Sequence, residues 1–234
     1  MKTLAMLAAV TLAAISATRA DLTIDQTIQG VQPVQQVTMK IKGDKARIDS
    51  GQQVTTLVDS GNGEIVTLMN DEKRFTRISG ERMKAMAQMA TQFSGVQKSS
   101  EQPKLTPTGK KETINGVETE EYTFETPQLK ASYWIAKNYP DGANILKQLQ
   151  SLTLQSFGGS SSGIPDYRQL PGLPLRTRMT IGDRDIVTNV RSIKQDPLPD
   201  ALFAIPAGYQ EVKLPDFPGV NSTTSPPAQP SPKP

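Results

Sequence analysis

Short segments of alternating apolar and polar residues, separated by tight polar turns, fill the chain from residue 22 to residue 78. In VQQVTMKIKG, Val37, Met39 and Ile41 alternate with polar residues, the period of two that places successive side chains on opposite faces of a strand. The turn signals GDK, SGQQ, SGNGE and NDEK separate this segment from the strand-like segments that follow. Connections this short join antiparallel strands, so the sequence predicts an antiparallel meander.

Two later segments change to the period of a helix. Between residues 79 and 93 the apolar residues recur at spacings of three and four, and Ser79 is suited to cap the helix start. This apolar stripe consists of Met83, Met86, Ala87, Ala90 and Phe93. A second helix is predicted after Pro140, with Asp141 near its cap. Its apolar face consists of Ile145, Leu146, Leu149 and Leu152.

The stretch GKKETINGVETEEYTFE, residues 109–125, predicts a hairpin with Asn115-Gly116 at its tip, because a type I′ turn needs positive φ at both central residues. In the resulting register Lys111 faces Glu120 and Lys110 faces Glu121, while Tyr122 and Phe124 share one face. Paired glutamates also serve as general acid and base in some enzymes. With a lysine predicted opposite each glutamate, we interpret the charges as structural.

The rest of the chain alternates between strand and loop signals. KASYWIAKN predicts a strand with Ala131, Tyr133 and Ile135 on one face and Trp134 on the other. LPLRTRMTIGDRDIVTNVRSIKQD predicts a hairpin about Gly182, and DALFAIPAGYQEV predicts one helical turn and a short strand. FGGSSSG, residues 157–163, predicts a flexible loop and lacks the ending of a phosphate-binding loop.

Both ends of the chain differ from its middle. Residues 1–20 have a basic start, a short apolar run and small residues before a cut, which predicts a secretory signal peptide. Residues 213–234 are rich in proline, which predicts a disordered or extended tail. We therefore expect a single domain over residues 21–212, exported most readily to a Gram-negative periplasm, with secretion from the cell as the alternative.

Composition excludes several classes of function. Of 26 basic residues, Lys2 and Arg19 fall in the predicted signal peptide, which leaves 24 basic against 23 acidic residues. This nearly balanced charge does not support binding to nucleic acid. The sequence contains no cysteine and no histidine, which excludes disulfides, the usual zinc sites and any Ser-His or Cys-His catalytic unit. We expect no cofactor, no metal, no membrane-spanning segment in the mature chain and no enzymatic activity, with a carboxylate-based hydrolase as the residual alternative.

The order of these elements resembles a family of exported bacterial proteins of unknown function. The resemblance rests on KKETINGVETEEYTFE, on KASYWIAKNYP and on the closing LPLRTRMTIGDRDIVTNVRSIKQDPLPDALFAIPAGYQEV. More distantly, the chain resembles the LolA/LolB superfamily of lipoprotein carriers. That resemblance implies an α+β, mainly β fold: a curved antiparallel sheet, or open half-barrel, with about two helices covering its concave face. In the carriers this space receives lipoprotein acyl chains.

Two functions follow as hypotheses. The first is a non-catalytic exported binding protein that carries lipid or lipoprotein acyl chains in an apolar cavity between sheet and helices. The candidate cavity residues are Met83, Met86, Ala90, Phe93, Tyr122, Phe124, Tyr133, Trp134, Leu146 and Leu149. The alternative is a structural or interaction module that contacts an envelope protein and holds no small ligand.

Overall fold

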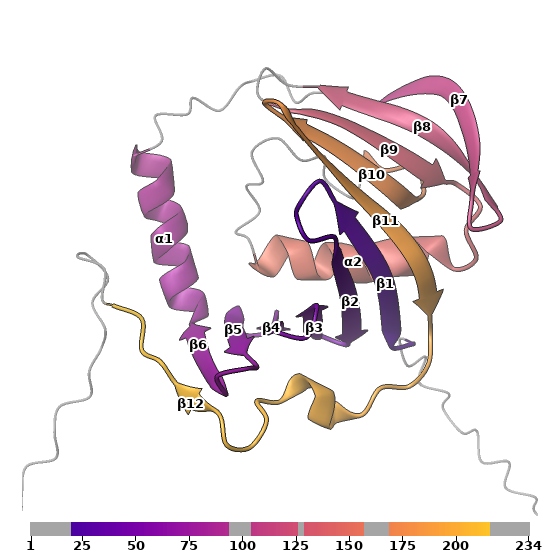
Figure 1. Ribbon diagram of the computed structural model, residues 1–234. Helices are drawn as coiled ribbons and strands as arrows, with labels where there is room; N and C mark the ends of the chain where they lie inside the picture. Colours follow the sequence, from indigo (N-terminus) through magenta and orange to yellow (C-terminus); the bar gives the residue numbers. More distant parts are fainter. Residues whose placement is uncertain (1–19, 94–103, 126–128, 157–168, 216–234) are drawn as a thin grey trace, which may run out of the picture.

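A computed structural model of the protein describes residues 20–93, 104–125, 129–156 and 169–215. Its centre is one twelve-stranded sheet, in the order β12-β6-β5-β4-β3-β2-β1-β11-β10-β9-β8-β7, which does not close into a barrel (Figure 1). β12 pairs with β6 in parallel, and the other neighbours are antiparallel. The predicted fold class, α+β and mainly β with an open antiparallel sheet and two helices, is confirmed.

The first six strands form the predicted meander, in which each strand pairs with the next along the chain. Their bounds are β1 Leu22–Gln29, β2 Gln35–Lys42, β3 Lys45–Ser50, β4 Val54–Asp59, β5 Glu64–Met69 and β6 Arg74–Ile78. Helix α1, Gly80–Phe93, follows β6 directly, and the amide of Arg82 donates to Ser79 Oγ at 3.3 Å. Ser79 therefore caps the helix as predicted.

The second half of the sheet begins with the predicted Asn-Gly hairpin. Its strands are β7 Thr106–Ile114, β8 Val117–Glu125, β9 Lys130–Ala136, β10 Leu173–Ile181 and β11 Arg184–Lys194. Helix α2, Gly142–Ser156, lies between β9 and β10 in the chain. After β11 come the short 3-10 helix η2, Asp200–Phe203, and the strand β12, Gln210–Glu211, as the sequence predicts. The predicted flexible loop 157–163 lies outside the described residues.

The two halves are joined by β1 and β11, which pair over seven positions with one bulge. One hydrogen bond shows that the sheet is strongly curved. The side chain of Asn115, at the β7–β8 turn, donates to Val190 O of β11 at 2.7 Å. β8 and β11 are separated by two strands in the sheet, a distance of about 14 Å if the sheet were flat. An asparagine side chain is too short to bridge that distance, so the hairpin bends back toward β11.

The main core lies between the sheet and α2, which crosses the inside of the bend (Figure 1). Ile145, Leu146 and Leu152 of α2 belong to one cluster with buried residues of both halves of the sheet. These partners include Leu22, Ile41, Ala46, Val58, Tyr122, Phe124, Tyr133, Ile135, Leu173 and Leu175. We call the sheet face that carries them the α2 face.

The other face of β4–β6 carries a second, smaller cluster of Leu57, Val66, Leu68 and Phe75. Residues 195–215, which we call the strap, run from the end of β11 across to β6, where β12 forms the edge of the sheet (Figure 1). Ile205 and Tyr209 of the strap pack against this cluster. The backbone amides of Gln210 and Val212 donate to Lys73 O and Phe75 O at 2.9 and 2.7 Å, which fixes the strap to β6.

The predicted hairpin register is confirmed near the tip and wrong further out. Ile114 faces Val117 and Lys111 faces Glu120, but a bulge between Pro107 and Lys111 removes Lys110 from the ladder. Gly109, with φ of 77°, lies within this bulge. The ion pairs also differ from the predicted cross-strand pairs. The Lys111 amine binds Glu118 at 3.1 Å, and the Lys137 amine binds Glu120 at 2.6 Å. The Lys110 amine still lies 3.5 Å from Glu121.

Candidate functional site

On β2–β6 the residues of the α2 face form rows across the strands, and along one of these rows burial decreases toward β6. One row runs Ile41–Ala46–Val58–Ile65–Ile78 in consecutive cross-strand pairs. The exposed fractions of Ile41, Ala46 and Val58 are 0%, 1% and 8%. Ile65 and Ile78, beyond them, are only half-buried. The cover that α2 provides therefore ends between β4 and β5.

The next rows are open along most of their length. Ile48, Thr56, Thr67 and Thr76 lie in register across β3–β6 and are all half-buried. Beside them Val54, 37% exposed, pairs with the half-buried Met69. We call this surface the open face, and it comprises Ile48, Val54, Thr56, Ile65, Thr67, Met69, Thr76 and Ile78. It is a continuous surface of apolar and threonine side chains.

Helix α1 begins beside the open face and carries the methionine stripe seen in the sequence. Its start is fixed, because a side chain at Gly80 would lie 2.4 Å from Asn62 O in the β4–β5 turn. Met83 and Met89 are half-buried and Met86 is 38% exposed. Among the described side chains of α1, none belongs to either hydrophobic cluster. Figure 1 shows α1 standing next to β6, at the end of the sheet away from β7.

The predicted cavity residues separate into three groups. Tyr122, Phe124, Tyr133 and Leu146 are buried in the main core, where Leu149 also packs, so their part of the interior is filled by the protein's own side chains. Met83 and Met86 lie on α1. Ala90 and Phe93 are also in α1, but their side chains lie outside the described residues. Whether any of these residues contacts a ligand remains a prediction.

Trp134 points to the face opposite Tyr133, as the alternation predicts. The guanidinium carbons of Arg176 and Arg178 lie 5.3 and 6.0 Å from its ring centre, within the range of cation–π attraction. Arg176 also binds both oxygens of Glu112 at 2.8 Å. Trp134 thus belongs to a charged cluster near the β7–β8 hairpin and is separate from the open face.

Sequence reasoning missed the open face itself. The alternation in IVTLMN and RFTRIS shows that Ile65, Thr67 and Met69 share a side, and that Thr76 and Ile78 do too. The sequence does not show that the cover from α2 ends before β5 and β6, because the position of α2 depends on contacts with distant strands.

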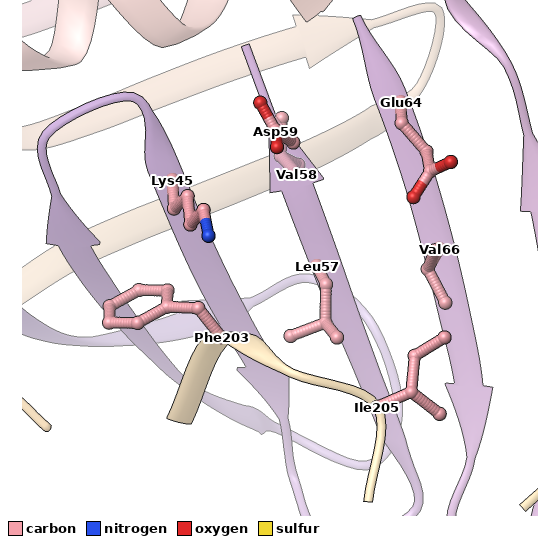
Figure 2. A pocket seen from close by; sticks show the side chains of 8 residues that line it. All are labelled: Lys45, Leu57, Val58, Asp59, Glu64, Val66, Phe203 and Ile205. Carbon is pink, nitrogen blue, oxygen red and sulfur yellow. The ribbon is translucent and has the colours of Figure 1, made fainter. Parts of the chain in front are cut away.

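A depression lies on the opposite face, between the strap and β3–β5 (Figure 2). Leu57, Val66, Phe203 and Ile205 gather at one end of it, and Lys45, Asp59 and Glu64 lie toward the other. Glu64 is bound by Arg77 Nη1 at 2.7 and 2.8 Å. We interpret this depression as the seam between the strap and the sheet, because Leu57 and Val66 belong to the second cluster and Ile205 of the strap packs on it.

The carboxylates with shifted pKa values are held in the ionised form. Burial favours a higher pKa for Asp49, but hydrogen bonds from Arg47, Thr55 and Lys40 outweigh it and lower the pKa. The hydrogen bond from Lys137 lowers the pKa of Glu120. A carboxyl group that acts as a general acid needs the opposite shift. Within the described ranges, no three acidic side chains gather to hold a metal ion.

Fold and surface together define a class: a mainly β protein with an unclosed sheet, one half of its inner face covered by a helix and the other half open. The family model for the domain of unknown function DUF4412 matches residues 18–209. The protein belongs to this family, which confirms the resemblance to a family of unknown function. A comparison with curated proteins finds no significant match.

Solved structures show only distant likeness. Lipoprotein LppX of Mycobacterium tuberculosis is 15% identical with a TM-score of 0.41, over 77% of this chain and 88% of that one. PNGF-II is 12% identical with a TM-score of 0.40 in one crystal form and 11% identical with the same TM-score in another. Both matches cover 83% of this chain, which spans only 31% and 32% of the PNGF-II chains. Likeness this distant carries no inference about a ligand or an activity.

Proposed function

We propose that this protein is an exported, non-catalytic binding protein that holds an apolar chain, such as a lipid acyl chain, against the open face. The observation that carries the proposal is the decrease in burial along Ile41–Ala46–Val58–Ile65–Ile78. The row remains apolar where its cover ends. Continuous apolar surface left in contact with water is typical of a binding site.

The chemistry of the open face favours a flexible apolar ligand. Isoleucine, valine and methionine offer no directional contacts, and the row Thr56–Thr67–Thr76 presents methyl groups together with hydroxyls. Burial of each CH₂ group contributes about 0.8 kcal/mol, so a long chain gains affinity without specific polar contacts. The methionines of α1 are adaptable side chains beside this surface.

Location and boundaries belong to the same proposal. The signal-like start at residues 1–20 supports export, after which residues 21–212 would act as one domain with a proline-rich tail at 213–234. Residues 1–19 and 216–234 lie outside the described residues. No helix in the described ranges is long and apolar enough to cross a membrane.

Lipid binding is tested by native mass spectrometry and lipid extraction of the purified protein, and by titration with a fluorescent fatty acid. Thr67→Asp places a carboxylate in the middle of the open face. It is expected to weaken binding about tenfold or more, because an unpaired charge on an apolar contact costs about 1.4 kcal/mol or more.

The matched control is Thr27→Asp, the same change at a half-buried strand position on the opposite face. This variant should bind like the unchanged protein, and the thermal midpoints of both variants show whether each is folded. If the unchanged protein is isolated empty and ignores the fatty acid, lipid binding is refuted. An interaction module that contacts an envelope protein then becomes the better explanation.

A further inference from the structure

The charged residues of β2–β6 are distributed very unequally between the two faces. Strand alternation places eight of their nine charged side chains on the face opposite α2. These eight are Lys40, Lys42, Lys45, Arg47, Asp49, Asp59, Glu64 and Arg77. Arg74 is the single charge on the α2 face of these strands, all of which the structure describes.

Arg74 lies at the rim of the open face. Cross-strand pairing puts it at the end of the row Val54–Met69–Arg74, and β12 pairs with its backbone through Gln210. Four residues further along these strands lies the row that contains Ile65 and Ile78, a distance of about 13 Å. A cation therefore marks one end of an uncharged surface, and α1 begins at the other end, just after Ile78.

The guanidinium of Arg74 is accessible to a ligand. Its only anionic partner within the described ranges is Glu72, with Nη1 3.2 Å from Oε2. The side chains of Arg74 and Glu72 are 52% and 58% exposed, so this pair is solvated and exchanges readily. Arg77, by contrast, binds both Glu64 and Glu211 on the other face.

We infer that Arg74 binds the carboxylate of a single-chain fatty acid whose hydrocarbon chain lies along the open face toward Ile65 and Ile78. This inference rests on the proposed function and adds the ligand class and the direction of the chain. One cation matches one negative charge, and a guanidinium matches the two oxygens of a carboxylate. The uncharged surface beyond Arg74 matches the chain.

The test uses isothermal titration calorimetry to compare the affinities of two ligands of equal chain length, a long-chain fatty acid and the corresponding fatty alcohol. The unchanged protein should bind the acid about tenfold more tightly than the alcohol. Arg74→Gln should weaken acid binding to the level of the alcohol and leave alcohol binding unchanged. Arg178→Gln, which removes an exposed arginine from β10, is the matched control and should change neither affinity.

A second variant acts in the opposite direction. Glu72→Gln removes the anion that competes for Arg74, so acid binding should become about two- to threefold tighter, with no change for the alcohol. Because Glu72 is exposed in a turn, this variant should fold normally.

The outcomes separate the two proposals. If acid and alcohol bind equally, if Arg74→Gln weakens both alike, or if Glu72→Gln fails to tighten acid binding, the role of Arg74 is refuted while the lipid-binding function stands. If neither ligand binds the unchanged protein, the proposed function fails and this inference fails with it.

Discussion

Asp49 links three polar side chains on the strap side of the sheet. Its carboxylate accepts hydrogen bonds from Arg47 Nε at 2.9 Å, Thr55 Oγ1 at 2.7 Å and Lys40 Nζ at 3.1 Å. Arg47 in turn donates to Leu202 O of the strap at 3.1 Å. The carboxylate thus orients the arginine that holds the strap, so it supports tertiary structure as well as its own strand.

Replacement of this carboxylate should destabilise the fold. Asp49→Ala leaves Arg47, Thr55 and Lys40 without their shared acceptor, which is expected to cost about 1–3 kcal/mol in the free energy of unfolding. Asp71→Ala, in the exposed β5–β6 turn, is the control and should change that free energy by less than about 0.5 kcal/mol. Urea denaturation measures both. Equal effects of the two substitutions would contradict the role given to Asp49.

At the scale of elements, the β7–β8 hairpin depends on two separate properties of Asn115. Its φ of 50° suits the type I′ turn, and its side-chain amide donates to Val190 O of β11. The acceptor is a carbonyl oxygen, so the contact requires an N–H donor on residue 115. Turn formation and attachment to β11 can therefore be separated by substitution.

Asn115→Asp tests this separation, because Asp-Gly supports the same turn but a carboxylate cannot donate to a carbonyl. The substitution should lower the free energy of unfolding by about 1 kcal/mol. Asn62→Asp is the matched control, because Asn62 Oδ1 accepts from the Glu64 amide and a carboxylate can do the same. Thermal unfolding measures the stability of both variants. An equal loss of stability in the two would contradict the attachment of Asn115 to β11.

Local elements were predictable from the sequence, because turns and caps depend on neighbouring residues. The Asn115-Gly116 tip, the Ser79 cap and the alternation around Tyr133 all agree with the structure. The outer part of the hairpin was not predictable, since the bulge at Gly109 leaves no clear pattern in the sequence.

Pairing between distant strands was beyond sequence reasoning. Asp25 in β1 accepts a hydrogen bond from Ser192 in β11, 167 residues away, and no periodicity specifies that partnership. The open face was missed for the same reason. The alternation in IVTLMN indicates the apolar side of this strand, but the exposure of the open face depends on where α2 packs. The sequence pointed to the aromatic core residues, which the structure shows to be packed together.

At the scale of the whole molecule, the inner face of the sheet has a covered half, which extends as far as Ala46 and Val58, and an open half, which is the open face. The covered half holds α2 and most of the buried residues, so it provides the stable framework. The open half is held from the opposite side by the strap, through the second cluster and through the amides of Gln210 and Val212. Because the strap supports these strands from the opposite side, the open face, on which we propose that a ligand binds, needs no cover of its own to keep its strands in the sheet.

The response of the molecule to pH follows from its ionisable groups. Burial alone would raise the pKa of Asp25 and Asp49, but hydrogen bonds from Thr38 and Ser192, and from Arg47, Thr55 and Lys40, lower it instead. A carboxyl group with a lowered pKa in the folded state stabilises the fold above its unfolded pKa of about 3.9, and this contribution is lost as the pH falls through the folded value.

The sequence contains no histidine, so few groups titrate between about pH 5 and pH 8. We therefore expect a thermal midpoint that is nearly constant from about pH 8 to pH 5 and falls below about pH 4, where Asp25 and Asp49 become protonated. Differential scanning calorimetry across this range measures the profile, and Asp49→Asn should make the acid decrease shallower. A steep loss of stability between pH 7 and pH 5 would contradict this account, because the lowered pKa values of Asp25 and Asp49 lie below that range.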